Sequence, residues 1–343
     1  MNAAARCVSV VDPIGVANDA MMPFLARALD PVEVQRQFDR HLSPPASGRP
    51  RFNLRSIRVA RHKTGRRCLI EYDLETGHDR PITLIGKARA RGLDHTTYRL
   101  QQSLWNAGFG SASQDHVRVP EPVGVIPAFH MWFQRKVPGT PATRLLAEPG
   151  AQALARRIAD AIHKLHQAGI PTSRRHMMAG ELRILHERLS LVAQMKPQWA
   201  GRLERILAAC DQLAAALPEP VSSHIHRDFY ADHVLVDGQH LYLLDFDLYC
   251  QGDAGLDVGN FAAHLTEQSL RTLGDPDGLQ AAGQALVDRF VELAGEATRA
   301  AVGVYTTLTL VRHIHLSTLF PERRPFTQTL LELCEGRLER TLA

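Results

Sequence analysis

The sequence predicts an α+β protein with two lobes, a small antiparallel β-rich N-lobe and a large, mainly helical C-lobe. Two observations predict this arrangement. Hydrophobic residues alternate with polar ones in several short segments between Phe52 and Val137, whereas beyond Gly139 they recur at the three- and four-residue spacing of helices. The chain of 343 residues is 45% hydrophobic, which suffices for two packed cores.

The first 50 residues are predicted to form an irregular arm around one short helix. The helix is expected from Pro31 to His41, because proline suits a first helical turn and apolar residues follow at helical spacing. The segment Ser-Pro-Pro-Ala-Ser-Gly at 43–48 is rich in helix breakers and should end it. We therefore assign residues 1–50 to an N-terminal arm.

Residues 51–136 are predicted to form the β-rich N-lobe. Apolar residues alternate on both sides of the turn Thr64-Gly65, which indicates a β-hairpin. A helix is expected from about residue 94 to residue 107, ending at Gly108. Further strands are expected at 82–88, 123–126 and 131–137.

Residues 137–343 are predicted to form the helical C-lobe. Apolar residues recur at helical spacing in 154–165, in two stretches between 182 and 217, and from 256 to the end. A tight hairpin interrupts the helices, because two short apolar runs flank the turn Asp237-Gly238. Such a hairpin brings together the residues just before it and just after it.

The charge balance and the cysteines argue against several classes of protein. Lys plus Arg number 40 and Asp plus Glu 36, so the net charge of +4 gives no reason to expect nucleic acid as a partner. The five cysteines are scattered without a C-x-x-C pair, which argues against a disulfide framework or a zinc ribbon. The sequence shows no signal peptide and no membrane span, so we expect a cytoplasmic protein with reduced thiols.

Three side chains are predicted to meet at the mouth of the hairpin. Asp228 and His233 precede the hairpin and Asp245 follows it. Carboxylates that gather in this way repel each other unless a cation neutralises them or one of them is protonated. The first expectation from these residues alone is therefore a divalent metal site.

The segment from His224 to Asp247 resembles the catalytic segment of the aminoglycoside phosphotransferase and choline kinase branch of the protein-kinase-like superfamily. The match consists of a His-x-Asp element beginning at His226, a metal-ligand position five residues after the aspartate, and a carboxylate after the hairpin. Two further elements are similar to those of the family, Leu-His-Gln-Ala-Gly-Ile-Pro at 165–171 and Gly-Asp-Ala-Gly-Leu-Asp at 252–257.

The resemblance implies a protein-kinase-like fold and an ATP-dependent phosphotransferase that transfers the γ-phosphate to a hydroxyl group of a small molecule. Asp228 is the implied catalytic residue, which orients the hydroxyl and takes its proton late. An ordinary helix or turn cap is the alternative for this residue. Asp245 is implied to bind Mg²⁺. Asp247 is expected to be a strand-end residue or a second ligand, and Asp257 a buried brace of the catalytic loop.

The resemblance also implies that the N-lobe holds the nucleotide. Lys87 ends an apolar strand, is one of only five lysines, and matches the lysine that holds the α- and β-phosphates in the family. The glutamate that pairs with this lysine in the family is missing from the following helix. A contact from a glutamine replaces the ion pair, or the pair is absent.

The remaining nucleotide contacts are expected around two segments. The loop at Gly65 contains a single glycine, and its backbone amides are expected near phosphate, helped by Arg66 or Arg67. The base is implied to lie against the segment that joins the lobes, with Gln134 and Lys136 as binding residues.

His233 stands where the family has asparagine. A neutral imidazole binds a metal through one nitrogen, but Mg²⁺ prefers oxygen ligands whereas Mn²⁺ tolerates nitrogen better. Three roles stay open for His233: a metal ligand, a contact to the β-phosphate, or no role in binding. Mg²⁺ is the expected ion, with Mn²⁺ as the alternative because of this histidine.

Other functions compete with a small-molecule kinase. The pattern H-x-H-x-D at 224–228 also resembles the start of the zinc-ligand set of metallo-β-lactamase-like hydrolases, but a hydrolase leaves Lys87 and Asp245 without a role. A nucleotide-binding pseudokinase, or a member that transfers a different group, would keep the fold and would not need the family's asparagine at the position of His233.

The expected acceptor is a small hydroxylated metabolite, with an aminoglycoside as the alternative. The sequence predicts no oligomeric state.

Overall fold

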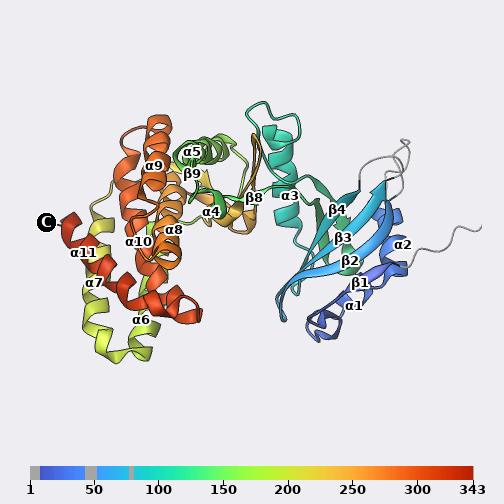
Figure 1. The fold of residues 1–343 in the computed structure, drawn as a ribbon, viewed down its shortest axis with the longest axis horizontal. Coiled ribbons are helices and arrows are strands. Elements are labelled where there is room, and N and C mark those ends of the chain that lie inside the picture. Colours follow the sequence, from blue (N-terminus) through green and yellow to red (C-terminus); the bar gives the residue numbers. More distant parts are fainter. Residues whose placement is uncertain (1–7, 43–51, 77–80, 343) are drawn as a thin grey trace, which may run out of the picture. The chain divides into compact units, whose positions relative to one another are not determined.

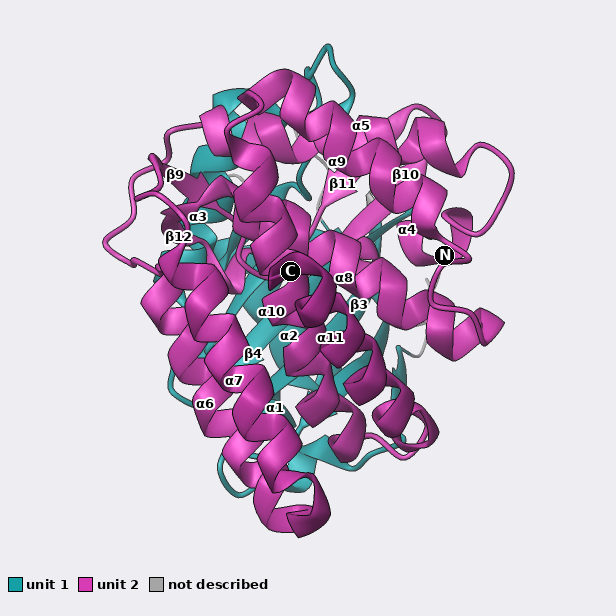
Figure 2. Cartoon of the chain, turned by 90° about the vertical axis from the view of Figure 1, so that its left-hand side faces the viewer, with its two compact units in different colours: residues 1–138 teal, residues 139–343 magenta. Residues whose placement is uncertain are grey.

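The computed structural model describes residues 8–42, 52–76 and 81–342, and the chain divides into two compact units. Unit 1 is Met1–Pro138 and unit 2 is Gly139–Ala343 (Figure 2). Unit 1 is built around a β-sheet, and unit 2 consists mainly of helices (Figure 1). The predicted α+β composition, with a β-rich N-terminal and a helical C-terminal part, is confirmed.

A six-stranded sheet forms the frame of unit 1, in the order β1-β2-β3-β4-β7-β6. β1 runs parallel to β2, and the other neighbours are antiparallel. The strands are β1 (Ser9–Val11), β2 (Phe52–Lys63), β3 (Arg67–Thr76), β4 (Ile82–Arg89), β6 (Pro122–Ile126) and β7 (Met131–Arg135). The other elements of unit 1 include α1 (Leu25–Ala28), α2 (Pro31–His41), α3 (His95–Leu104) and β5 (Val117–Arg118).

The described part of the first 50 residues packs on this sheet, where the sequence predicted a separate arm. The helix predicted from Pro31 to His41 is confirmed as α2, and the ring of its Phe38 lies 5.2 Å from Tyr72 and 5.4 Å from Phe133. The hydroxyl of Tyr72 donates to the carbonyl of Ala28 at 3.0 Å. Burial of this helix face in the sheet core is the reason that the segment belongs to unit 1. The predicted breaker segment 43–48 lies outside the described residues.

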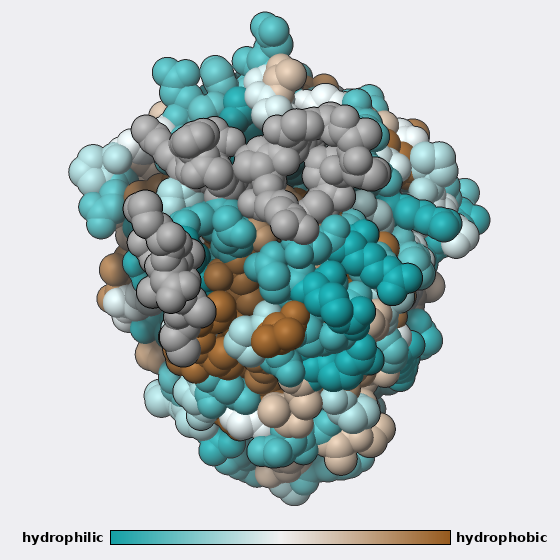
Figure 3. Space-filling model, turned by 90° about the vertical axis from the view of Figure 1, so that its right-hand side faces the viewer, coloured by the Kyte–Doolittle hydropathy of each residue, from teal (hydrophilic) through white to brown (hydrophobic). Residues whose placement is uncertain are grey.

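The surface of unit 1 is mixed, and Figure 3 shows a hydrophobic area among hydrophilic residues. The large hydrophobic residues exposed near the start of the chain are Val10, Val11, Ile14, Met21 and Val32. No helix in the described part of the chain is both long and apolar enough to span a bilayer.

Unit 2 contains short β-strands between its helices. The hairpin predicted around Asp237-Gly238 is confirmed as β10 (Val234–Asp237) and β11 (His240–Leu243), and β8 (Thr140–Pro141) flanks it. β9 (Ser222–Ile225) pairs with β12 (Cys250–Asp253). The helices are α4 (Ala142–Leu145), α5 (Ala151–Gln167), α6 (Met178–Met195), α7 (Ala200–Ala215), α8 (Ala254–Leu273), α9 (Gln280–Ala294), α10 (Thr298–Leu319) and α11 (Thr327–Leu342).

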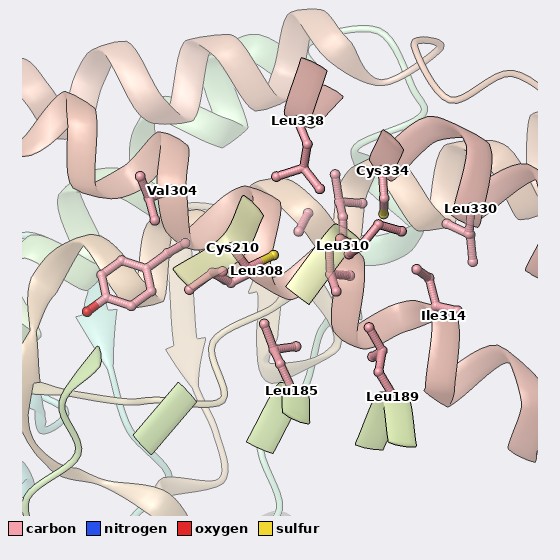
Figure 4. Close-up of a cluster of buried hydrophobic side chains, with 14 of the residues drawn as sticks. Leu185, Leu189, Cys210, Val304, Leu308, Leu310, Ile314, Leu330, Cys334 and Leu338 are labelled. Atoms are coloured by element: carbon pink, nitrogen blue, oxygen red, sulfur yellow. The ribbon is translucent and has the colours of Figure 1, made fainter. Parts of the chain in front are cut away.

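The helix α8 is held closely against α10. A Cβ atom at Gly259 would lie 2.7 Å from the Cβ of Tyr305 and 2.8 Å from the amide nitrogen of Thr306, so only glycine permits this approach. A cluster of buried side chains from α6, α7, α10 and α11 continues the core (Figure 4). Its members include Leu185, Leu189, Cys210, Leu308, Leu310, Ile314, Leu330, Cys334 and Leu338. α8 therefore offers a fixed support to the loops that pack on its first turns.

Candidate active site

The open end of the β10–β11 hairpin gathers the three side chains that the sequence singled out. Because Val234 pairs with Leu243, His233 stands directly before the hairpin and opposite the chain that leads to Asp245. The His233 ring lies between two carboxylates, with Nδ1 4.0 Å from Oδ2 of Asp228 and Nε2 3.8 Å from Oδ2 of Asp245. The structure thus brings Asp228, His233 and Asp245 together.

The hydrogen bonds of His233 fix its protonation. Its Nδ1 lies 2.7 Å from the backbone carbonyl of Asp228, and because a carbonyl only accepts, Nδ1 carries the proton. Burial and the neighbouring His226 lower the pKa of His233 below its ordinary value, and they outweigh the opposite effect of Asp228 and Asp245. The ring is therefore neutral at pH 7, and Nε2 presents a lone pair toward Asp245.

The carboxylates of Asp228 and Asp245 are accessible to solvent, whereas the carboxylate of Asp257 is not. The side chains of Asp228 and Asp245 are 43% and 34% exposed, whereas Asp257 is fully buried at the start of α8. The Asp257 carboxylate accepts from the backbone amides of His226, at 2.8 Å, and Arg227, at 2.6 Å. Asp257 thus braces the loop from inside, as expected, whereas Asp228 and Asp245 are accessible to solvent.

The backbone on both sides of the hairpin adopts the left-handed region. Arg227 has φ of +69° and Asp245 has φ of +62°. Asparagine and aspartate tolerate this region better than arginine does, so Arg227 needs support from its surroundings. The hydrogen bond from its amide to Asp257 supplies that support. This geometry directs the loop that carries Asp228.

Two histidines join elements that are distant in sequence. His166 of α5 contacts Asp257 through Nε2 at 2.8 Å and is a buried, hydrogen-bonded histidine. His226 donates through Nε2 to the carbonyl of Leu244 at 2.8 Å, and its ring centroid lies 5.7 Å from that of His233. His226 therefore ties the loop before the hairpin to the chain after it.

Asn260 is a supporting residue that the sequence reasoning missed. Its Nδ2 donates to the carbonyl of Phe229 at 2.9 Å, and its Oδ1 accepts from Nη2 of Arg312 at 2.6 Å. The signal was its position one turn after Asp257 on α8, which places both side chains on one helix face. Its contact with α10 depends on a pairing of distant segments that the spacing does not show.

The residues present fit a divalent ion in part. The described ranges contain no ready group of three or more His, Cys, Asp or Glu residues for a metal ion. Nε2 of His233 and Oδ2 of Asp245 nevertheless lie 3.8 Å apart. This separation is less than twice a metal–ligand distance of ~2.1 Å, so one ion between them could contact both atoms. A mixed nitrogen and oxygen donor set of this kind suits Mn²⁺ better than Mg²⁺.

The predicted nucleotide residues of unit 1 lie on the sheet. Lys87 of β4 is paired in register with Trp132 of β7, and its ammonium group lies 4.6 Å from the Trp132 ring centroid. Gln134 is two residues further along β7, so it shares the face of Lys87 and Trp132. Lys136 forms an ion pair of 2.9 Å with Glu71. The structure thus gathers Lys87 and Gln134 on one face.

The structure shows how the acid nearest to Lys87 along the chain is used. Asp94 accepts from the amide of Thr97 at 3.0 Å and forms an ion pair with Arg89 at 2.8 Å, so it caps α3. α3 itself contains no glutamate or aspartate. Gln101 donates to the carbonyl of Pro120 at 2.7 Å. α3 therefore provides no carboxylate for Lys87.

Gly65 takes the turn position that the sequence predicted, between β2 and β3. Its φ of +62° lies in the left-handed region, which glycine adopts without strain. Its amide donates to the buried carboxylate of Asp19 at 2.8 Å. The amide of Gly65, which the sequence predicted to lie near phosphate, therefore already donates a hydrogen bond within the protein.

Comparisons with known proteins are consistent with these observations. The model of the phosphotransferase enzyme family matches residues 95–295. No curated protein matches the sequence. A solved choline/ethanolamine kinase family protein from Mesorhizobium loti is 16% identical with a TM-score of 0.58, over 93% of this chain and 95% of the other.

Two further solved structures are similar. A glucosamine kinase in complex with glucosamine, ADP and inorganic phosphate is 14% identical with a TM-score of 0.57, over 91% of this chain and 83% of the other. Aminoglycoside phosphotransferase APH(4)-Ia is 15% identical with a TM-score of 0.56, over 84% of this chain and 94% of the other. At these identities the likeness shows the fold alone, and the predicted protein-kinase-like fold is confirmed.

Proposed function

The chain belongs to the phosphotransferase enzyme family, as the sequence resemblance indicated, and on this premise we propose that it transfers the γ-phosphate of ATP to a hydroxyl group of a small molecule. The observation that carries the proposal is the hairpin mouth, where two partly exposed carboxylates flank a neutral histidine and the buried Asp257 braces the loop. Phosphoryl transfer needs groups held in position more than it needs a strong base.

Asp228 is the proposed catalytic residue. Its exposed carboxylate orients the acceptor hydroxyl and takes the proton as the bond to phosphorus forms. The hydrogen bond from His233 to its carbonyl and the bond from Asn260 to the next carbonyl hold the loop in place. The position of Asp228 is therefore set by the protein and does not depend on which acceptor binds.

Asp245 and His233 are the proposed metal ligands. A divalent ion bound there would neutralise negative charge on the β- and γ-phosphates. The neutral state of His233 supports this role, because only an unprotonated nitrogen binds a metal. We propose Mg²⁺ as the ion, with Mn²⁺ as the alternative because His233 is a nitrogen ligand.

The nucleotide is assigned to unit 1. We propose that Lys87 contacts the α- and β-phosphates, that Gln134 and Lys136 lie beside the base, and that the turn at Gly65 lies near the phosphates. The shared face of Lys87 and Gln134 supports this assignment. A cytoplasmic location agrees with the four described cysteines, which are free thiols.

A screen of hydroxyl acceptors tests the proposal. The full chain is incubated with ATP and with sugars, amino alcohols and aminoglycosides, and ADP release is measured with Mg²⁺ and Mn²⁺ in parallel. We expect acceptor-dependent ADP release with at least one class of acceptor, and we expect Mn²⁺ to support this release as well as Mg²⁺ does. A small hydroxylated metabolite is the expected acceptor.

A pseudokinase that binds nucleotide without transfer, or a member that transfers another group, is the second candidate. Two observations favour it: histidine replaces asparagine at position 233, and α3 lacks an acid for Lys87. The screen separates the two functions. If no acceptor supports ADP release while ATP still raises the melting temperature, nucleotide binding without phosphotransfer is the function.

A further inference from the structure

The face of α8 that supports the catalytic loop continues along the helix beyond Asn260. His264, Glu267 and Arg271 follow at successive spacings of four, three and four residues, so their side chains share this face. α8 packs against α10 along this stretch of chain. The face therefore forms a polar seam between the two helices.

Adjacent rings connect this seam to the hairpin mouth. The centroid of the Tyr230 ring lies 4.3 Å from that of His233 and 4.6 Å from that of His264. The His264 ring in turn lies 4.5 Å from the ring of His313 on α10. The two histidines of the seam therefore lie beside the proposed active site, within unit 2.

Three arginines lie around these two histidines, and we call them the arginine cluster: Arg271, Arg312 and Arg323. Burial lowers the pKa of His313 most, and Arg312, Arg323 and Arg271 lower it further. Burial and His313 lower the pKa of His264, and Arg312 and Arg323 add to this effect. A charged group shifts a neighbouring pKa at short range, so these guanidinium groups lie close to the histidine pair.

The arginine cluster carries more positive charge than the acids that contact it. Arg271 and Arg323 share the carboxylate of Glu267, at 3.2 Å and 3.7 Å. Arg312 faces the carboxylate of Glu181 at 3.5 Å. Two carboxylates thus serve three guanidinium groups, and one positive charge is left over.

The arginines of the cluster are partly exposed, whereas the two carboxylates are buried. The side chains of Arg271, Arg312 and Arg323 are 28%, 19% and 26% exposed, and those of Glu267 and Glu181 are 6% and 3% exposed. A ligand that approaches this part of unit 2 therefore meets guanidinium groups. Such a surface attracts an anion and repels a cation.

His313 is a second, independent observation at the same place. Its side chain is buried, and neither of its ring nitrogens has a hydrogen-bond partner within the described residues. Buried polar groups in native proteins are generally paired by the protein, by water or by a ligand. An unpaired imidazole beside three guanidinium groups favours a polar ligand at this seam.

We propose that the arginine cluster binds an anionic group of the acceptor, a carboxylate or a phosphate, so that the acceptor is a small anionic alcohol and not a cationic aminoglycoside. Guanidinium groups match both anions because each presents two parallel N–H donors. The inference rests on the proposed function, whose acceptor it defines. The acceptor oxygen bonds to the γ-phosphorus, the bond to the β-phosphate oxygen breaks, ADP leaves, and Asp228 takes the hydroxyl proton.

Binding of inorganic phosphate tests the anion site without turnover. Phosphate is added to the full chain, and the ring signal of His264, assigned by its loss in His264→Gln, is followed by NMR. We expect this signal to shift at millimolar phosphate in the wild type. Arg323→Gln should weaken the affinity at least about tenfold, because one charged contact is lost.

The matched variants exclude a folding effect. Glu267 keeps its contact with Arg271 in Arg323→Gln, so this carboxylate stays paired. Arg323→Lys should retain most of the affinity, because the charge stays in place. Arg205→Gln should bind phosphate like the wild type, because Arg205 is exposed on α7, outside the cluster. A wild-type signal that does not shift, or equal affinity in Arg323→Gln, overturns the proposal.

Acceptor-dependent ADP release identifies the anionic group. Glycerol, glycerate, glycerol 3-phosphate and 3-amino-1,2-propanediol share one carbon skeleton and differ in charge. Glucose, glucuronate, glucose 6-phosphate and glucosamine form a second such series. We expect release with an anionic member, and the preferred member distinguishes carboxylate from phosphate. Arg323→Gln should raise KM for this acceptor at least about tenfold and change kcat little, because Arg323 binds the acceptor away from the reacting oxygen.

The outcomes separate this proposal from the proposed function. A neutral or cationic compound as the best acceptor overturns the proposal, and so does a KM that Arg323→Gln leaves unchanged. If no compound of the two series or of the wider screen supports ADP release, the proposed phosphotransfer is contradicted. The phosphate titration then still decides whether the arginine cluster is an anion site.

Discussion

The hairpin mouth of unit 2 and the face of the unit 1 sheet that carries Lys87 are the two regions with proposed functional residues, and they are built differently. In unit 2 the backbone places the functional groups: Asp228 and Asp245 are set by strand register, left-handed turns and the buried Asp257. In unit 1 long cationic side chains, such as Lys87 over Trp132, project from a regular sheet. The carboxylates need exact placement by the backbone, whereas phosphate charge can be met by any cation within reach.

The first prediction removes a backbone-placed group. Asp245→Asn should lower kcat with Mg²⁺ by about 10³-fold, because the carboxylate that would hold the ion is lost. Asp237→Asn is the matched control at the far end of the same hairpin, and it should retain the wild-type rate. Coupled ADP release measures both variants. A similar loss in both would show that the hairpin, and not its mouth, limits activity.

The second prediction removes the brace. Asp257→Asn weakens the acceptor of two buried amides and of His166, so the free energy of unfolding should fall by about 3 kcal/mol. For a folding unit of the size of unit 2 the melting temperature should drop by about 6–12 °C.

A second aspartate–histidine pair is the control for the brace. Asp211 pairs with His186 at 3.0 Å, but both side chains are nearly half exposed, so Asp211→Asn should shift the melting temperature by about 2 °C or less. Equal shifts in the two variants would show that burial does not distinguish the pairs. Activity should fall only in Asp257→Asn.

The third prediction concerns a side chain of unit 1. Lys87→Met should weaken ATP binding about tenfold and change kcat less, because one point charge among several cations is lost. Lys196→Met is the control, since Lys196 lies 6.0 Å from the ring of Trp199 in unit 2 and has no proposed role. Titration with ATP, followed by thermal shift, measures both. An unchanged affinity in Lys87→Met would remove Lys87 from the site.

The smallest expected effect is a pH dependence of stability in unit 2. Burial lowers the pKa of His264 and of His313 well below the ordinary value, so both are neutral when folded. The unfolded chain binds protons at these residues below about pH 6.5, and the folded chain does not, so stability should fall as pH decreases below that value.

Replacement of one buried histidine tests this dependence. His313→Leu should make the melting temperature less sensitive to pH between about 6.5 and 5. His186→Leu, at an exposed position, should leave the slope unchanged. A steeper slope in His313→Leu would contradict the assignment.

The sequence predicted the hairpin mouth because its residues lie close together along the chain. The two-residue turn Gly238-Gln239, which follows Asp237, sets the register of β10 and β11, so convergence at the mouth follows from spacing alone. The support of the loop by His166 and Asn260 could not be predicted, since it depends on how α5, α8 and α10 pack. Local patterns carry no information on such contacts.

The strand β1 and the pairing of β2, β3 and β4 could not be predicted, for related reasons. β1 spans only Ser9–Val11, which is too short for an alternating pattern to identify a strand. The pairing of β2, β3 and β4 places Lys63, Arg67 and Arg89 side by side. The sequence shows these residues only as scattered basic positions, because the register of the strands depends on contacts between distant segments.

The central claim is that the hairpin mouth performs phosphoryl transfer and does not merely bind nucleotide. The most direct test compares turnover and ATP binding in Asp228→Asn. We predict that acceptor-dependent ADP release falls by about 10³-fold or more, while ATP raises the melting temperature by the same amount as in the wild type. Turnover equal to that of the wild type would contradict the account, because the exposed carboxylate would then have no part in the reaction.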